Sequence, residues 1–379
     1  MVEFTYIKTQ EQLESLCNIL AKESKIAFDC EFIRETTFVP VLCLMQIATE
    51  RKIYIIDPIK LNLDPFLPLL TNNKILKIMH SAIQDIDVFF KNFSVIPKPI
   101  FDTQIAASFL GYGDSISYAK LVKTLTGEVI NKDNKLTHWQ KRPLDKAQIN
   151  YALLDVKYLF VIYGNLYGKL QDSKRYKWFI DEVDNLYYLN NYYVCPEEAW
   201  KRVNSSGNRP FFFNYLQAFA KLREEIAVAS NRPRRFIIKD ETLIQLANLQ
   251  PKCKEDILND RILQKFLSRN IINQILKVSL EINKTDQELI STKHKKLSGN
   301  KALICDYLKI FLKYTANKYD IAAKYIAKTE ELEDFIQEEH DGIRFLSGWR
   351  YEIFGKGAKK IITGRMTLKI INKKLLFCN

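Results

Sequence analysis

The sequence predicts an N-terminal α/β domain, a mixed sheet with helices packed against it, followed by two all-α domains. Short apolar runs rich in Ile, Val and Phe alternate with helical patterns through about the first 170 residues. After about residue 185 strand-like runs become scarce, and amphipathic helical patterns such as FFFNYLQAFAKLREEIAVASN take over. The chain has 379 residues, more than one hydrophobic core usually serves. Several domains are therefore expected.

The α/β pattern comes from six short apolar runs. The predicted strands are residues 4–7, 26–32, 41–49, 53–57 and 75–79, and a short strand near Ile100. The short turn at residues 50–52 predicts an antiparallel hairpin, whereas helices separate the later strands and favour parallel pairing. Asp102 is expected to cap the helix of TQIAASFLG. Pro143 suits the first turn of a long helix from about Leu144 to Leu170.

Two polar stretches predict the domain boundaries. NLYYLNNYYVCPEEAWKRVNSSGNRP carries Pro, Ser, Gly and Asn and is typical of a connector, and STKHKKLSGN is basic and poor in helix formers. The predicted division is an α/β domain at 1–190, a linker at 191–209, a first helical domain at 210–292 and a second at 298–379. No sequence motif shared by the two helical domains is visible.

Acidic residues interrupt the predicted strands and helices in three places. Asp29 and Glu31 lie two apart on a strand, so both carboxylates point to one face, where their repulsion requires a shared proton or a cation. Asp85 and Asp87 in HSAIQDIDVFF lie on a helix and cannot share a face, and chemistry alone does not choose between them. In YALLD, Tyr151 and Asp155 are four apart on one helix face. Singly, each acid is typical of a cap or a solvated charge.

Composition narrows the functional classes. Seven scattered cysteines without a Cys-x-x-Cys pair argue against a disulfide framework and a zinc site, and favour reduced thiols in the cytoplasm. The first residues lack a secretory pattern, and there is no run of 18 apolar residues, so no membrane association is expected. Residues 1–200 hold 23 Lys and Arg against 24 Asp and Glu, so the +13 net charge resides in the C-terminal half. That asymmetry favours a nucleic-acid partner.

Together, the motifs resemble those of the DEDD superfamily of 3′-5′ exonucleases, in the branch with tyrosine in its last motif. IAFDCEFIRETTFVPVLCLMQIAT, YIIDP, HSAIQDIDVFF, FDTQIAASFLG and HWQKRPLDKAQINYALLDVKYL resemble the ribonuclease D family in order and spacing. LREEIAVASNRPRRFIIKDETLIQLANLQP resembles its helical HRDC domain, and FLSGWRYEIFGKGAKKIITGRM the end of a divergent second copy. The chain departs from the family at His138, where an acid or amide usually precedes the tryptophan.

The resemblance implies a ribonuclease H-like sheet and a set of site residues. The family's catalytic residues fall on Asp29, Glu31, Asp85, Tyr151 and Asp155. The four carboxylates would hold two divalent cations, Mg²⁺ or Mn²⁺, for phosphodiester hydrolysis that releases 5′-mononucleotides from RNA 3′ ends. Tyr151, with a reference pKa near 10, is expected to orient the attacking water rather than act as a base. By resemblance, transfer RNA precursors are the leading substrates of a monomeric enzyme.

Further residues are candidate RNA contacts. They are Gln46, His80, Trp139, Arg232, Arg234, Arg235 and Lys239. GKGAKK at 355–360 lacks the Walker spacing and is expected to be a turn that touches phosphate. A DNA exonuclease of the same fold stays open because the site residues do not report the 2′ hydroxyl. A non-catalytic RNA-binding protein is disfavoured by the four acids, and a helicase by the missing G-x-x-x-x-G-K-[ST] loop.

Overall fold

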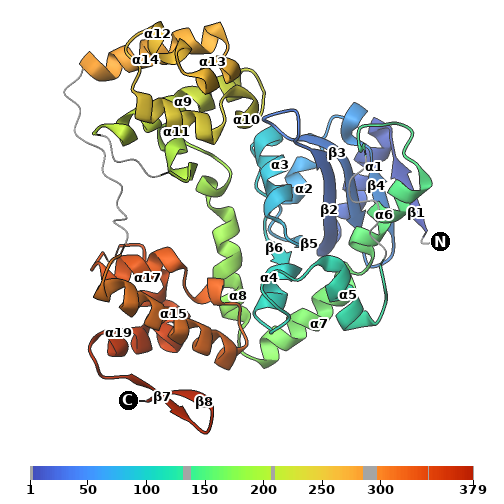
Figure 1. Ribbon diagram of the computed structural model, residues 1–379. Coiled ribbons are helices and arrows are strands. Elements are labelled where there is room, and N and C mark those ends of the chain that lie inside the picture. Colours follow the sequence, from blue (N-terminus) through green and yellow to red (C-terminus); the bar gives the residue numbers. More distant parts are fainter. Residues whose placement is uncertain (1–2, 131–137, 206–209, 285–296, 340, 379) are drawn as a thin grey trace.

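The computed structural model describes residues 3–130, 138–205, 210–284, 297–339 and 341–378. Figure 1 shows the α/β domain with its sheet and helices. One helical domain adjoins it near α10, and the other adjoins it near α8. The sheet has six strands in the order β1-β4-β3-β2-β5-β6. Their bounds are β1 Phe4–Ile7, β2 Lys25–Ile33, β3 Val41–Ala48, β4 Ile53–Ile56, β5 Leu76–Met79 and β6 Ile100–Asp102.

The sheet is mixed, as the sequence predicts. β2, β3 and β4 pair antiparallel, while β1 with β4, β2 with β5 and β5 with β6 pair parallel. The helices of this domain are α1 Gln10–Leu20, α2 Leu67–Thr71, α3 Ile83–Phe93, α4 Thr103–Ser108, α5 Tyr118–Thr126, α6 Lys146–Lys157, α7 Leu159–Asp172 and α8 Tyr176–Val183, with the 3₁₀ turn η1 Pro58–Lys60. Asp102 caps α4 by accepting from the Gln104 and Ile105 amides, so that prediction is confirmed.

The long helix predicted from Leu144 to Leu170 is wrong in its start and in its continuity. Pro143 lies outside the helix, and α6 begins at Lys146, because the Asp145 carboxylate accepts from the Gln148 amide in a capping box. α6 then ends at Lys157. The backbone amide of the next residue, Tyr158, donates to the Tyr118 hydroxyl at 3.2 Å, and α7 starts at Leu159. A side chain from α5 thus contacts the backbone at the break between the two helices.

Two helical domains follow, and they repeat one arrangement. α9 Phe212–Ala229, α10 Arg234–Ile237 and α11 Asp240–Leu249 have the same order and similar spacing as α15 Asn300–Tyr319, α16 Ala323–Ile326 and α17 Thr329–Ile336. The remaining elements are η2 Asp184–Tyr187, η3 Leu189–Asn191, η4 Pro196–Arg202, α12 Lys254–Leu258, α13 Arg261–Phe266, α14 Arg269–Lys284, η5 Arg344–Leu346, α18 Gly348–Arg350, η6 Tyr351–Gly355 and α19 Lys356–Ile362.

A β-hairpin extends the second domain, which the sequence led us to expect to be all-α. β7 Thr367–Ile371 pairs antiparallel with β8 Lys374–Cys378. Phe377 attaches the hairpin to the domain by packing against the rings of Phe311 and Tyr314, at centroid distances of 4.7 and 5.1 Å. GKGAKK is helical rather than a turn, since η6 continues directly into α19.

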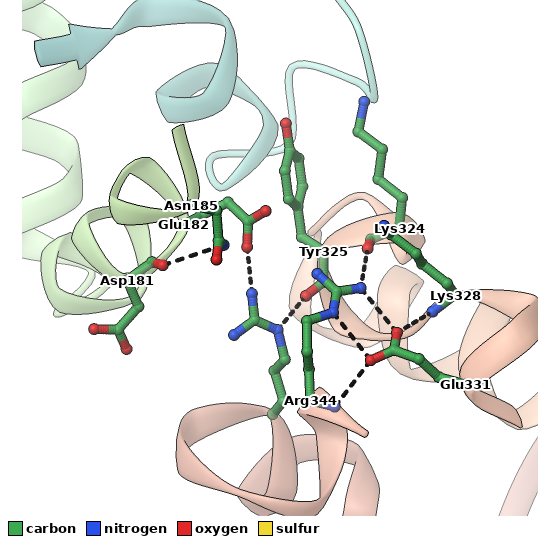
Figure 2. A network of polar contacts seen from close by, with 9 residues as sticks. Asp181, Glu182, Asn185, Lys324, Tyr325, Lys328, Glu331 and Arg344 are labelled. Carbon is green, nitrogen blue, oxygen red and sulfur yellow. Dashed lines mark hydrogen bonds and ion pairs between the residues drawn. The ribbon is translucent and has the colours of Figure 1, made fainter. Parts of the chain in front are cut away.

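The second helical domain shares its hydrophobic core with the α/β domain. One cluster of buried side chains runs from the sheet through α8 into α15–α19, whereas the first helical domain has a cluster of its own. At the shared face, Trp178 stacks on Trp349 with ring centroids 4.8 Å apart. Arg350 donates to the Glu182 carboxylate and, at 2.6 Å, to the Tyr325 carbonyl. Figure 2 shows Glu182 beside the Arg344–Glu331 ion pair.

The first helical domain meets the α/β domain through a short loop. The backbone amides of Phe38 and Val39 donate to the carbonyl and side-chain oxygens of Asn231, at 3.1 and 2.9 Å. The Arg234 guanidinium lies over the Phe38 ring, 4.8 Å from its centroid. This contact between the first helical domain and the α/β domain involves few residues, whereas the second helical domain shares a continuous core with the α/β domain.

Candidate active site

The acidic centre forms where β2 ends and α6 crosses the sheet. Ligand atoms of Asp29, Glu31 and Asp155 all lie within 4.8 Å of one another. A register shift between Glu31 and Phe32 marks a bulge at this end of β2, a device that re-aims side chains beside functional sites. Asp155 lies on α6, which packs on β2, β3 and β4. Three of the four predicted carboxylates therefore converge.

Tyr151 lies one helical turn before Asp155 and faces the same centre. Burial, followed by the charges of Asp155, Glu31 and Asp29, raises the pKa of Tyr151 well above its ordinary value. The hydroxyl therefore keeps its proton at neutral pH and can form hydrogen bonds but cannot act as a base, as expected from its reference pKa. The Trp139 ring, 3% exposed, packs on Tyr151 at 5.9 Å between centroids.

Asp85 lies beside this centre but is not one of the three converging acids. It is 6% exposed on α3, and its Oδ1 accepts from the Cys30 thiol at 2.8 Å. Burial raises the pKa of Asp85 above its usual value, and the bond from Cys30 partly offsets this. Asp87 instead forms ion pairs with Lys91 and Arg34, at 3.1 and 3.5 Å, on the surface side of α3. The two aspartates, which residue chemistry alone did not distinguish, thus have different environments.

The candidate RNA contacts near the centre have distinct environments. Gln46 is directly opposite Asp29 in the β2–β3 register and fully buried, and within the described residues neither atom of its amide has a hydrogen-bond partner. His80 Nδ1 lies 2.9 Å from the Thr103 hydroxyl. Because that hydroxyl donates its proton to the Met79 carbonyl, His80 Nδ1 is the donor in its contact with Thr103.

The basic cluster of the first helical domain divides in two. Arg234 forms a two-bond ion pair with Glu224, whose carboxylate is 2% exposed, and so has a structural partner instead of a free guanidinium. Arg232, Arg235 and Lys239 are exposed, and Arg235 also donates to the Glu35 carbonyl at 3.5 Å. The prediction of an RNA contact is therefore weakest for Arg234, because its charge is already neutralised.

Arg142 anchors the Trp139 loop, a role that the sequence pattern does not predict. Arg142 donates to both carboxylate oxygens of Asp57, at 2.5 and 2.8 Å, and to the carbonyls of Trp139 and Cys43, each at 2.7 Å. Tyr6 adds a third bond to Asp57, at 3.0 Å. Both Arg142 and Asp57 occur in the quoted segments, but nothing in their spacing of 85 residues predicts the pair.

Comparisons with known proteins cover both the α/β domain and the first helical domain. A 3′-5′ exonuclease family model matches residues 4–171, and an HRDC domain model matches residues 212–278. The ribonuclease D of Bartonella henselae is 39% identical over 96% of this chain and 91% of its own length. That of Zymomonas mobilis is 36% identical over 96% and 95%.

Solved structures show the same fold. The crystal structure of Escherichia coli RNase D, an exoribonuclease involved in structured RNA processing, aligns with a TM-score of 0.85 at 24% identity, over 96% of this chain and 99% of that one. The catalytic core of RRP6 from Trypanosoma brucei aligns at 0.57 and 21% identity, over 74% and 81%. From its near full-length relatives, its fold and its acidic centre, the chain belongs to the ribonuclease D family of 3′-5′ exoribonucleases.

Proposed function

We propose that this exoribonuclease trims single-stranded RNA 3′ ends by metal-dependent hydrolysis at the centre formed by Asp29, Glu31 and Asp155, with 5′-mononucleotides as products. The observation that carries the proposal is the convergence of three carboxylates within 4.8 Å. Like charges held so close require a compensating cation or proton. Transfer RNA precursors are the proposed substrates, since they are what the family resemblance implies.

The donor set fits Mg²⁺ or Mn²⁺. All three converging ligands are carboxylate oxygens, which hard divalent cations prefer, and no nitrogen or thiolate ligand joins them among the described residues. Asp85 would complete the four-carboxylate set, and the Cys30 thiol holds it next to β2 in the meantime. Bound divalent cations would lower the pKa of the attacking water and stabilise the negative charge that develops at phosphorus.

The chain's own groups would orient the RNA terminus. Tyr151 retains its proton, so it can donate a hydrogen bond to the attacking water or to a phosphate oxygen. Trp139 holds the Tyr151 ring in place from one side. The buried Gln46 amide, opposite Asp29, offers both a donor and an acceptor to a bound nucleotide.

The helical domains would hold RNA upstream of the reacting end. The exposed Arg232, Arg235 and Lys239 would contact phosphates, an interaction that weakens with salt and is largely blind to sequence. We propose that the protein acts as a monomer in the cytoplasm. In the described part of the chain, no helix combines the length and apolarity that a bilayer crossing requires.

The test is a 5′-labelled RNA with a single-stranded 3′ tail, incubated with Mg²⁺, Mn²⁺ or EDTA beside the same sequence in DNA. We expect a ladder that shortens from the 3′ end with RNA and metal, and that disappears with EDTA and in Asp29→Asn. Asp87→Asn is the matched control, because Asp87 pairs with Lys91 and Arg34 outside the centre. Binding without shortening under either metal would contradict the proposal, and faster DNA cleavage would reassign the substrate.

A further inference from the structure

One buried carboxylate outside the acidic centre holds the beginnings of two helices. Asp102, the last residue of β6, accepts hydrogen bonds from backbone amides on both sides of it in space. The amides of Gln104 and Ile105, at 2.8 and 3.1 Å, belong to α4, for which Asp102 is the N-cap. The amides of Ser81 and Ala82, at 3.2 and 2.8 Å, belong to the turn before α3. Capping of α4 explains only the first pair of bonds.

The turn before α3 depends on this outside carboxylate. Ala82 precedes the helix and has no side chain that could accept from its first amides. Ser81 has a φ of +61°, in the left-handed region, which a residue other than glycine adopts only where surrounding contacts hold it. Asp102 provides such contacts to both amides from the neighbouring strand. β5 and β6 pair in parallel, with Met79 directly opposite Asp102.

Thr103, the next residue, holds the same turn at a second point. Its side chain is fully buried, and its hydroxyl donates to the Met79 carbonyl at 3.0 Å. The same oxygen lies 2.9 Å from His80 Nδ1. Two consecutive side chains thus fix the end of β5 and the start of α3, and with them the direction in which α3 leaves the sheet.

Asp85 lies in the first turn of α3, three residues after Ala82. Its carboxylate therefore moves with the backbone that Asp102 holds. The Cys30 thiol, on β2, also donates to Asp85 at 2.8 Å. A thiol is a weak donor, so Cys30 can orient the carboxylate, but it does not determine where the helix begins.

The type of residue at position 102 matches this double role. A short hydroxyl side chain would be sufficient to cap α4 alone, since serine and threonine are good N-caps. Only a longer side chain with two acceptor oxygens reaches the amides of both helices. Because all of these partners donate, an asparagine in place of Asp102 would turn its own N–H towards a backbone N–H and lose a bond.

We propose that Asp102 is a positioning residue for the hydrolysis. By holding the turn before α3, it places the Asp85 carboxylate where it can share divalent cations with the acids of β2 and α6. The inference rests on the proposed function, in that it takes Asp85 as a cation ligand. Outer-shell groups that orient metal ligands typically contribute about 10–100-fold to metal affinity or activity.

Asp102→Ser separates the two roles of this side chain. Serine keeps the cap of α4, but its hydroxyl is too short to reach the turn before α3. We expect Mn²⁺ binding to the full chain, measured from the free-ion signal in electron paramagnetic resonance, to weaken about 10–100-fold. On a trinucleotide at saturating metal, kcat should fall at least about tenfold while KM changes little. Asp102→Asn should lie between the wild type and Asp102→Ser.

A second substitution tests the turn itself. Ser81→Gly, added to Asp102→Asn, should restore part of the Mn²⁺ affinity and of kcat, because glycine adopts a φ of +61° without strain. A side chain that only capped α4 would show neither the loss of affinity nor its rescue from position 81. If Asp102→Ser does not fold, Asp102→Asn and its rescue by Ser81→Gly decide the question.

Asp260→Ser is the matched control. Asp260 caps α13 in the first helical domain in the same way, by accepting from the Ile262 and Leu263 amides at 3.0 and 3.1 Å. The change should leave both Mn²⁺ affinity and kcat on the trinucleotide unchanged. Losses in Asp260→Ser equal to those in Asp102→Ser would contradict the inference, because they would follow from weakening any helix cap.

The Mn²⁺ titration also distinguishes this inference from the proposed function. Wild-type Mn²⁺ affinity and kcat in the folded Asp102 variants would overturn the positioning role and leave the proposed hydrolysis intact. Equal Mn²⁺ binding by the wild type and Asp29→Asn would refute the cation site itself, and the role of Asp102 with it.

Discussion

Neutralising one acid of the centre should stabilise the metal-free protein while it abolishes activity. In Asp29→Asn the side chain keeps its shape but loses the charge that repels Glu31 and Asp155. A residue kept for structure behaves in the opposite way, because its removal lowers the free energy of unfolding. The two signs therefore separate a cation site from an ordinary polar cluster without a measurement of catalysis.

The magnitude follows from the distances. Two unit charges 4.8 Å apart repel by about 3.5 kcal/mol at an effective dielectric constant of about 20, and Asp29 takes part in two such pairs. Proton uptake limits this repulsion, because protonating a carboxyl of pKa near 4 at pH 7 costs only about 4 kcal/mol. Asp29 and Glu31 are partly solvated, which reduces the repulsion further. We expect Asp29→Asn to gain about 1–3 kcal/mol.

Thermal unfolding in EDTA and in excess Mg²⁺ measures both signs. In EDTA, Asp29→Asn should melt above the wild type, and Asp87→Asn below it, because Asp87 loses two ion pairs. In Mg²⁺ the wild type should gain about 2.7 kcal/mol at a hundredfold excess over Kd, and Asp29→Asn much less. If Asp29→Asn melts below the wild type in EDTA, or if both gain equally from Mg²⁺, the centre is not a cation site.

Three further predictions concern charged side chains with several polar partners. Arg142→Met should lower the free energy of unfolding, measured by urea titration, by about 3 kcal/mol; this is the lower end for a buried ion pair, because both side chains are partly exposed. The same change should lower kcat, because Trp139 loses the bond from Arg142 to its carbonyl. Arg142→Lys should restore part of both the stability and kcat. Burial alone would raise the pKa of Asp57, but bonds from Arg142 and Tyr6 hold it below its usual value. The Asp57 carboxylate therefore stabilises the fold above about pH 4, and this stabilisation is lost as the pH falls through the folded pKa. The melting temperature of Asp57→Asn should consequently depend less on pH than that of the wild type in that range. Lys77→Met should lower the free energy of unfolding by about 2–4 kcal/mol in urea titrations, because the ammonium donates to the carbonyls of Asn72, Ile75 and Lys98 at 3.0, 2.7 and 2.6 Å. Unchanged stability would mean that water satisfies these carbonyls in the variant.

Local signals in the sequence were sufficient for the sheet. All six strands lie within a residue or two of their predicted places, since alternation and turn residues act over short distances. Predictions of helix caps succeeded where one side chain determines the start of the helix, as at Asp102. They failed at Pro143, where Asp145 and Gln148 form the cap instead, and at Tyr158, where a hydroxyl from α5 interrupts the helix.

Long-range pairing accounts for what the sequence did not reveal. The repeat of the two helical domains is visible in the succession of helices, because helix lengths and spacings persist where side chains have changed. The ion pair between Arg142 and Asp57, and that between Arg234 and Glu224, depend on side chains brought together by folding. Periodicity does not report such contacts, so a basic cluster alone could not distinguish a structural arginine from one that contacts RNA.

The core shared by the α/β domain and the second helical domain has a consequence for synthesis. Trp178 and Phe109 leave the ribosome more than a hundred residues before Trp349 and Tyr325, the rings they pack against. At about 5–20 residues per second, this aromatic face stays uncovered for roughly 10–50 s, while the first helical domain completes its separate core. The nascent chain is therefore most prone to aggregation, and most dependent on chaperones, during that interval.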